Sequence, residues 1–479
     1  MDKIQEAHDN SALYQLCGEA VAVTNPWTNS LLVNTVRQIP NQTYSETTLI
    51  RSLTESVICN IPSVGYLKRA VLVFTFTARK KDPGLIQAYY TSIEDMLGLV
   101  GSITFRANGN RMLLTIPSEA IIAELYLHRN RYSRYLELFQ YPYIDMSVEG
   151  DRGADGRLSS TEIAIPIPFG FLEKLYASFD FTDIKDGQFF IQMTPAFSVG
   201  ALQSKVSNGA NPPTINWVTE DILKVIAEKT PDGYNDNDML NLQVKMEFDS
   251  MIPNPSELRS LKLANREAGP NGIPHLISDY TNGGVYVFRR GEFNTKDLPW
   301  PDGSGTQQIE ALLPIRIKDA VRMMTMFVCL DTYSVNKDAG SFSKWGPFPP
   351  TVGATFGNVF VKPFENMFGT CQIEGSGAIL YESSKALQDS LTHTEKSGYT
   401  RITNNAFSWE FFENATNALE YGQILPTTNI ANLFLRVRPN PNYDFRPLKD
   451  NMMIVLVFQT QALMSYSDDN HTFNITRMT

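Results

Sequence analysis

The chain has 479 residues, enough for two to four domains, and its 43% hydrophobic and 11% aromatic residues exclude a disordered polypeptide. Its formal net charge of −10 excludes a broadly basic protein that holds nucleic acid through the phosphates. Abundant Phe (28), Tyr (20), Pro (27) and Gly (30) favour strands joined by turns and long loops. We therefore expect an all-β protein without a specific nucleic-acid partner.

The first 30 residues are predicted to form an N-terminal arm. A short helix is expected there, with one face formed by Ile4, Ala7, Leu13 and Leu16. The polar first ten residues lack the apolar core of a secretion signal, and the longest apolar run, 452–458, is too short to span a bilayer. We expect a soluble chain made in the cytosol and not secreted. The glycosylation-type sequences then stay unmodified; they begin at Asn41, Asn414, Asn470 and Asn474.

A first β-domain is predicted over residues 31–251. Residues 71–74 are apolar on both faces and indicate a central strand, whereas the alternation over 242–248 indicates a strand with one wet face. Ser118, followed by Glu119, is a candidate cap for a helix over 118–139. The predicted strands cover residues 53–61, 70–78, 101–105, 111–116, 161–169, 188–194 and 240–248.

A Pro-rich linker is predicted over residues 252–274, and a second β-domain with a C-terminal tail over 275–479. A second helix is expected over 383–394. The last strand is long and mostly apolar, so we expect folding to require it. The predicted strands cover residues 285–289, 308–317, 321–329, 371–373, 378–381, 407–411, 432–437 and 452–462.

One series of landmarks runs through both halves, about 210–270 residues apart, which is the spacing of whole domains. Lys68-Arg69-Ala70-Val71 and Lys318-Asp319-Ala320-Val321 each introduce an apolar run. Each run is followed by a strand that turns at small polar residues, 103–110 and 372–377. A Pro-marked strand comes next, 165–169 and 424–426, and a closing strand ends each half. The recurrence predicts a duplicated β-domain, although any all-β chain offers some such marks by chance.

Two long loops and one basic patch each have two possible structural roles. The loops, residues 200–216 and 332–369, either form surface contacts or fold back on their own domain. The patch, residues 127–135, holds His128 and three arginines. It either complements the end of the predicted helix or meets an anionic inner surface or a partner chain.

Motifs for catalysis or cofactor binding are missing from the sequence. No two of His8, His128, His275, His393 and His471 lie four residues apart, and no phosphate-binding loop or nucleophile elbow occurs. The glycine spacing of residues 150–156 lacks a strand before it and a helix after it. The acidic loop from Asp232 to Asp238 does not fit the helix–loop–helix calcium pattern, and whether it binds a metal stays open. We expect no enzyme, no cofactor, and no catalytic, cofactor-binding or metal-ligating residues.

The cysteines are scattered, without a Cys-x-x-Cys pair. Cys59 and Cys329 lie among apolar strand residues and are predicted to be buried reduced thiols. Cys17 and Cys371 give no further signal.

Over residues 52–466 the chain resembles the double jelly-roll major capsid proteins of large DNA viruses, virophages, adenovirus-like elements and membrane-containing bacteriophages. Residues 165–169 resemble the Pro-x-Pro-aromatic strand of the first jelly roll in that family. Residues 313–318 resemble the opening of the second, and the stretch around Leu387 and 397–399 resembles virophage capsid proteins. The resemblance implies two tandem eight-stranded jelly rolls with short helices in the connecting loops.

The resemblance also implies a function without catalysis. Such proteins form homotrimers whose six jelly rolls make a pseudo-hexagonal capsomer that tiles an icosahedral shell. The expected partners are further copies, neighbouring capsomers, minor capsid and penton proteins, and an internal membrane, and the expected location is the virion. Two alternatives remain. One is a carbohydrate-binding or carbohydrate-active β-sandwich, suggested by Trp217, Trp300, Trp345 and Trp409; the other is a penton or spike protein.

Overall fold

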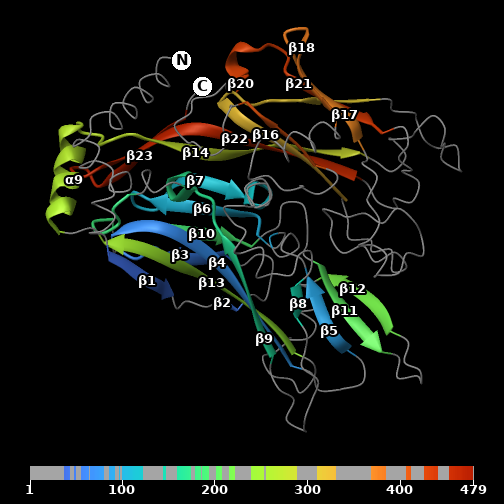
Figure 1. The fold of residues 1–479 in the computed structure, drawn as a ribbon, viewed down its shortest axis with the longest axis horizontal. Coiled ribbons are helices and arrows are strands. Elements are labelled where there is room, and N and C mark those ends of the chain that lie inside the picture. Colours follow the sequence, from blue (N-terminus) through green and yellow to red (C-terminus); the bar gives the residue numbers. More distant parts are fainter. Residues whose placement is uncertain are drawn as a thin grey trace, which may run out of the picture.

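The computed structural model of the chain describes twenty stretches. They are residues 37–43, 48–49, 56–63, 65–79, 86–91, 97, 100–121, 144–146, 159–173, 179–184, 186–193, 201–207, 215–221, 239–252, 255–288, 310–330, 368–384, 406–411, 425–440 and 452–477. They form antiparallel sheets stacked in layers, with the N-terminal half on one side and the C-terminal half on the other (Figure 1). The predicted arm lies outside the described residues.

The first jelly roll consists of two facing sheets. One has the order β1-β13-β4-β9, with β2 (Thr48–Leu49) also pairing with β13, and the other has the order β3-β10-β6-β7. Their strands are β1 (Arg37–Thr43), β3 (Ser56–Asn60), β4 (Tyr66–Arg79), β6 (Ser102–Ala107), β7 (Arg111–Pro117), β9 (Ser159–Pro166), β10 (Gln188–Gln192) and β13 (Met239–Ile252).

The second jelly roll repeats this arrangement. One sheet has the order β14-β22-β16-β19, joined by β20 (Leu425–Pro426) and β23 (Thr472–Arg477), and the other has the order β15-β21-β17-β18. Their strands are β14 (His275–Phe288), β15 (Ala311–Pro314), β16 (Ala320–Leu330), β17 (Phe368–Gly375), β18 (Ala378–Ser384), β19 (Ala406–Glu410), β21 (Phe434–Pro439) and β22 (Met452–Ser467).

In order along the chain, each half pairs its eight main strands as first-eighth-third-sixth and second-seventh-fourth-fifth. The sequence landmarks fall at equivalent places in the two halves. Val71 and Val321 both lie near the start of the third strand, and their partners there are Pro166 and Leu425. In the second half the sixth position is divided between β19 and β20, which both pair with β16. The fold therefore confirms the prediction of two tandem jelly rolls.

A further small sheet, β12-β11-β5-β8, is built from the connections of the first jelly roll. It combines β5 (Ile86–Thr91), β8 (Ile144–Met146), β11 (Ala201–Ser207) and β12 (Ile215–Asp221). The prediction of a long loop over 200–216 was therefore wrong. Residues 201–207 and 215–221 form two antiparallel strands, which pair from Ala201↔Asp221 to Ser207↔Ile215 as in a hairpin.

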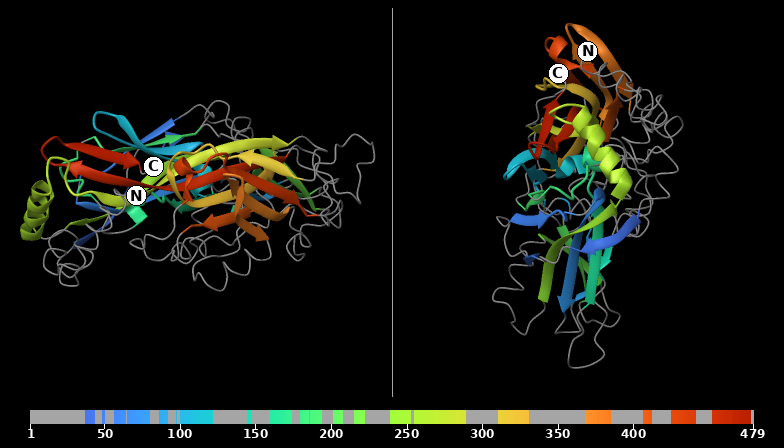
Figure 2. Two further views of the ribbon diagram at one scale, coloured as in Figure 1. Left: turned by 90° about the horizontal axis from the view of Figure 1, so that it is seen from above. Right: turned by 90° about the vertical axis from the view of Figure 1, so that its left-hand side faces the viewer.

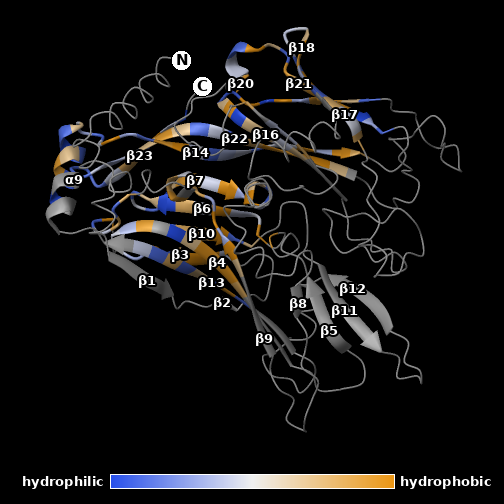
Figure 3. Ribbon diagram, viewed as in Figure 1, coloured by the Kyte–Doolittle hydropathy of each residue, from blue (hydrophilic) through white to orange (hydrophobic). Residues whose placement is uncertain are grey.

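Two hydrophobic clusters fill the molecule. One occupies the first jelly roll and continues into residues of the second, and the other lies between the sheets of the second jelly roll. Alternate residues of β22 belong to different clusters: Val455 and Val457 to the first, Leu456 and Phe458 to the second. Because β22 is buried on both faces, its first seven residues, 452–458, form a continuous apolar run, whereas the strands of sheet β3-β10-β6-β7 are of mixed hydropathy (Figure 3).

The segment predicted as a linker contains a helix, α9 (Pro255–Glu267), which stands beside both jelly rolls (Figure 2). Pro255 at its first position and Gly269 just past its end agree with helix boundary preferences, although no helix was predicted from the sequence in this linker. The other described helical residues are Leu97, the start of the predicted 118–139 helix (118–121), α7 (Gly170–Glu173) and η2 (Thr427–Asn429). The first two residues of the predicted 383–394 helix belong instead to β18, which runs through Ser384, and the rest of that segment lies outside the described residues. None of the described helices is long and apolar enough to cross a membrane.

Candidate functional site at the junction of the two jelly rolls

The contact between the two jelly rolls, here called the junction, is the most elaborate polar and aromatic arrangement among the described residues. It brings together the turn after β6, helix α7, helix α9 and strands β14 and β23. The junction fixes how the two jelly rolls lie relative to each other, so it determines the shape of the block that one chain presents.

Phe473 of β23 inserts into the aromatic core of the first jelly roll. Its side chain is 2% exposed, and its ring centroid lies 5.4 Å from that of Phe105, 5.3 Å from Phe179 and 6.3 Å from Phe181. Tyr466 of β22 closes the group from the other side at 4.8 Å. Edge-to-face aromatic pairs of this kind add to the free energy of burial itself, so the last strand of the chain is anchored in the first domain.

Asn108, in the turn between β6 and β7, binds the main chain of Phe473. Its amide Nδ2 donates to the carbonyl oxygen of Phe473 at 2.8 Å, and its Oδ1 accepts from the backbone N–H of Phe473 at 2.7 Å. Asn108 has a φ of 54°, a left-handed conformation that Asn tolerates better than most residues. The turn therefore positions the Asn108 side-chain amide to make the two main-chain hydrogen bonds that an adjacent strand would otherwise make with Phe473.

Gly170 allows α7 to approach β14 closely. A Cβ atom on Gly170 would lie 2.2 Å from the backbone oxygen of Ser278 and 2.6 Å from its nitrogen. No side chain fits in that space, so the close contact of the two jelly rolls at this point depends on glycine.

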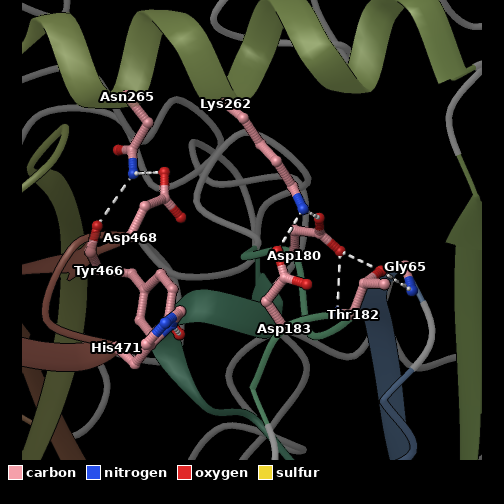
Figure 4. A network of polar contacts seen from close by, with 9 residues as sticks. All are labelled: Gly65, Asp180, Thr182, Asp183, Lys262, Asn265, Tyr466, Asp468 and His471. Carbon is pink, nitrogen blue, oxygen red and sulfur yellow. Dashed lines mark hydrogen bonds and ion pairs between the residues drawn. The ribbon is translucent and has the colours of Figure 1, made fainter.

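Helix α9 is bound to both jelly rolls through its polar face (Figure 4). Asn265 donates to the carbonyl oxygen of Tyr466 at 3.0 Å and to Asp468 at 2.9 Å, and accepts from the backbone N–H of Ile273 at 2.7 Å. One turn earlier, Lys262 pairs with Asp183 of the first jelly roll. The helix thus connects the end of β22 to the first jelly roll.

The first-roll side of this network is itself ordered by hydrogen bonds. Asp180 lies 3.7 Å from the Lys262 ammonium and accepts from both the backbone N–H and the hydroxyl of Thr182. The Thr182 hydroxyl accepts from the N–H of Gly65 at 3.0 Å. Burial lowers the pKa of Lys262, but Asp183 and Asp180 outweigh it, so the net shift is upward and the ammonium stays charged.

Two titratable rings at the junction are held neutral. Burial, with Asp468 as the next cause, raises the pKa of Tyr466 to about 12. Burial beside Phe179, whose ring meets the imidazole edge-on at 5.2 Å, lowers the pKa of His275 to about 4. Neither group supplies a proton donor or acceptor tuned to neutral pH, so these residues serve packing.

Two further ion-pair groups lie within the second jelly roll. Arg477 of β23 donates to buried Asp279 of β14 at 2.8 Å. Arg436 of β21 contacts Glu374 through Nε at 2.6 Å and Nη2 at 2.9 Å, and also pairs with Glu310. Hydrogen bonds from Arg436 lower the pKa of both glutamates.

Several residues singled out in the sequence fall outside the described part of the chain: the loop from Asp232 to Asp238, residues 150–156, the basic patch at 127–135, and Trp300 and Trp345. Among the described residues, no three His, Cys, Asp or Glu side chains are grouped as metal ligands would be. Cys59 is a buried thiol, as predicted, and so is Cys371. Cys329 lies in β16, where its side chain is not described.

The junction residues were not identified from the sequence. The turn at 108–110 was predicted, but nothing local indicates that its first amide binds a strand 365 residues away. A usable signal existed for β23, since Thr472–Arg477 alternates polar and apolar residues.

The fold matches solved viral capsid proteins, whereas no protein-family model and no curated protein matches the sequence. PBCV-1 VP54, fitted into a cryo-EM reconstruction of the virophage Sputnik, has a TM-score of 0.55 and 9% identity, covering 92% of this chain and 96% of its own. The Faustovirus major capsid protein has a TM-score of 0.53 and 9% identity, with coverages of 89% and 90%. At this identity the similarity establishes the fold, and the chain has the double jelly-roll fold of viral major capsid proteins.

Proposed function

We propose that this protein is a viral major capsid protein that assembles as a homotrimer. The observation that carries the proposal is the pair of jelly rolls with identical strand order, joined through a buried aromatic and hydrogen-bonded junction in the fold of known capsid proteins. One chain supplies two blocks side by side, so three chains supply the six blocks of a pseudo-hexagonal capsomer. Such capsomers tile an icosahedral shell without catalysis.

The division of the chain follows from the same proposal. Residues 31–251 and 275–479 are the two building blocks, residues 252–274 connect them, and residues 1–30 form an arm. The partners are further copies of the chain, minor capsid and penton proteins, and an internal membrane beneath the shell. The chain is made in the host cytosol and resides in the virion.

The mass of the purified protein tests the proposal. Size-exclusion chromatography with light scattering should give about 160 kDa, three times the 53.8 kDa of one chain. Negative-stain electron microscopy should show threefold particles with a six-lobed outline. A well-folded species that stays monomeric at high concentration contradicts the proposal, and fivefold or fibrous particles would indicate a penton or spike instead.

The carbohydrate-binding alternative has less support. Trp409, one of the four tryptophans that suggested it, is buried in the core of the second jelly roll and stacks on Phe407, so it is not displayed to a glycan. A glycan array with the purified chain decides this alternative, and we expect no binding.

A further inference from the structure

Within one chain, the second jelly roll packs against an edge strand of the first jelly roll. Strand β7 ends the sheet β3-β10-β6-β7 and lies against β14. A β-bulge leaves Leu113 as the extra residue, because Phe105 pairs with Leu114 and Arg106 with Met112. Leu113 packs against the hydrophobic cluster that continues into the second jelly roll, whereas its neighbour Met112 stays 66% exposed.

The second jelly roll repeats this edge, and no described strand or helix covers it. Among the described strands, β18 is the outermost of the sheet β15-β21-β17-β18. It carries a bulge at the same place, because Ile373 pairs with Tyr381 and Glu374 with Ile379. Leu380 is therefore equivalent to Leu113, and Ile379 to Met112. Leu380 is 37% exposed and Ile379 is 56% exposed.

Leu380 belongs to a defined apolar site. It lies with Ile430 and Leu433 around Gly375, where a Cβ atom would be 2.2 Å from Ile430 and 3.2 Å from each leucine. Leu433 and Ile430 are part of the core of the second jelly roll or pack against it. The core thus reaches the surface at this edge, on the side of the molecule away from the first jelly roll (Figure 1).

The charged residues beside this edge tolerate being covered. Glu374, which pairs with Ile379, accepts two hydrogen bonds from Arg436. A carboxylate that is already paired loses less on desolvation than an isolated one, so covering Glu374 does not bury an uncompensated charge.

We propose that the β18 edge, with Leu380 at its bulge, receives the first jelly roll of a second copy of this chain, as β7 receives the second jelly roll within one chain. The proposal rests on the proposed trimer and specifies the contact between its copies. Each chain then carries one filled and one open edge of the same kind, and such head-to-tail contacts close into a ring. They also cover an apolar strand edge that would otherwise promote aggregation.

Adjacent residues provide the test and its control. The variant Leu380→Glu should weaken trimer formation by about tenfold or more, since a charge would replace a covered apolar contact. Ile379→Glu should leave trimer formation unchanged, because its counterpart Met112 stays exposed at the filled edge. Analytical ultracentrifugation across a concentration series measures both, and circular dichroism with thermal unfolding shows that each variant is folded.

Hydrogen exchange of the wild-type chain is a second measurement, independent of any variant. Amides of residues 379–382 should exchange more slowly in the trimer than in monomer obtained by dilution. A Leu380→Glu trimer as stable as wild type, equal weakening by both variants, or unchanged exchange along β18 overturns this contact while the trimer stands. A wild-type chain that is monomeric at high concentration overturns the proposed function as well.

Discussion

Asn108 and Phe473 lie 365 residues apart in sequence and exchange two hydrogen bonds, both through the main chain of Phe473. The same residue buries its ring among the aromatic side chains of the first jelly roll. The first domain thus contacts both the backbone and the side chain of Phe473, which lies in the last strand. The arrangement couples the C-terminal strand to the folding of the N-terminal half.

Replacing Asn108 with glycine should weaken this coupling. Asn108→Gly keeps the left-handed backbone accessible but leaves the N–H and C=O of buried Phe473 without their partners. We expect the free energy of unfolding to fall by about 1–3 kcal/mol, the cost of unsatisfied buried groups, measured by urea denaturation.

Asn110→Gly is the matched control for that variant. Asn110 also has a positive φ, 73°, but is exposed, so the substitution carries the same backbone entropy cost without losing the two bonds. Equal stability of the two variants would show that the Asn108 amide contributes nothing.

Truncating Phe473 should be more severe. Phe473→Ala removes a fully buried ring from contact with Phe105, Phe179 and Tyr466, and large-to-small changes of this kind cost about 3–5 kcal/mol. Phe473→Leu should retain most of the stability. Differential scanning calorimetry should show the single transition of wild type dividing into two in the alanine variant, and an undivided transition at the wild-type temperature would contradict this.

Gly170→Ala should loosen the contact between α7 and β14. The new methyl group would overlap the backbone of Ser278, which cannot rotate away, so we expect a loss of about 1–3 kcal/mol in thermal unfolding. Gly369→Ala is the control, because a Cβ there lies 3.6 Å from Asn440, an ordinary contact. If the two variants unfold at the same temperature, the close approach of α7 to β14 does not require glycine at position 170.

Most strands were predictable because their side-chain patterns report burial directly. Residues 71–74, apolar on both faces, form the interior of β4, between β13 and β9, and the alternation over 242–248 matches alternating burial along β13. These patterns depend on which face of a strand meets a core, and that is a local property.

The missed features depend on contacts between distant segments. The hairpin of β11 and β12 resembles a loop in composition, and its strands pair with β5 to complete a sheet assembled from separate connections. Likewise, α9 contacts both jelly rolls, and the sequence of the helix alone does not show where those two domains lie. The junction was invisible for the same reason: Gly170 and Asn108 owe their roles to partners in the other half of the chain.

A buried carboxyl predicts an unusual pH dependence. Glu119 follows the predicted helix cap Ser118, is 2% exposed, and has no hydrogen-bond partner for its Oε2 among the described residues. Burial raises its pKa from 4.5 to about 7, and the hydrogen bond from Ser118 opposes this only partly. Between these two pH values the folded state binds more protons than the unfolded state, so stability falls as pH rises.

Glu119→Gln removes this titration, so its stability relative to wild type should increase by about 3 kcal/mol between pH 4.5 and pH 8. Urea denaturation at several pH values in that range measures the difference. Glu374→Gln is the control of opposite sign: hydrogen bonds from Arg436 lower the pKa of Glu374, so its contribution is present at neutral pH and lost as pH falls. A Glu119→Gln difference that does not change with pH would mean that Glu119 is ionised in the folded protein throughout this range.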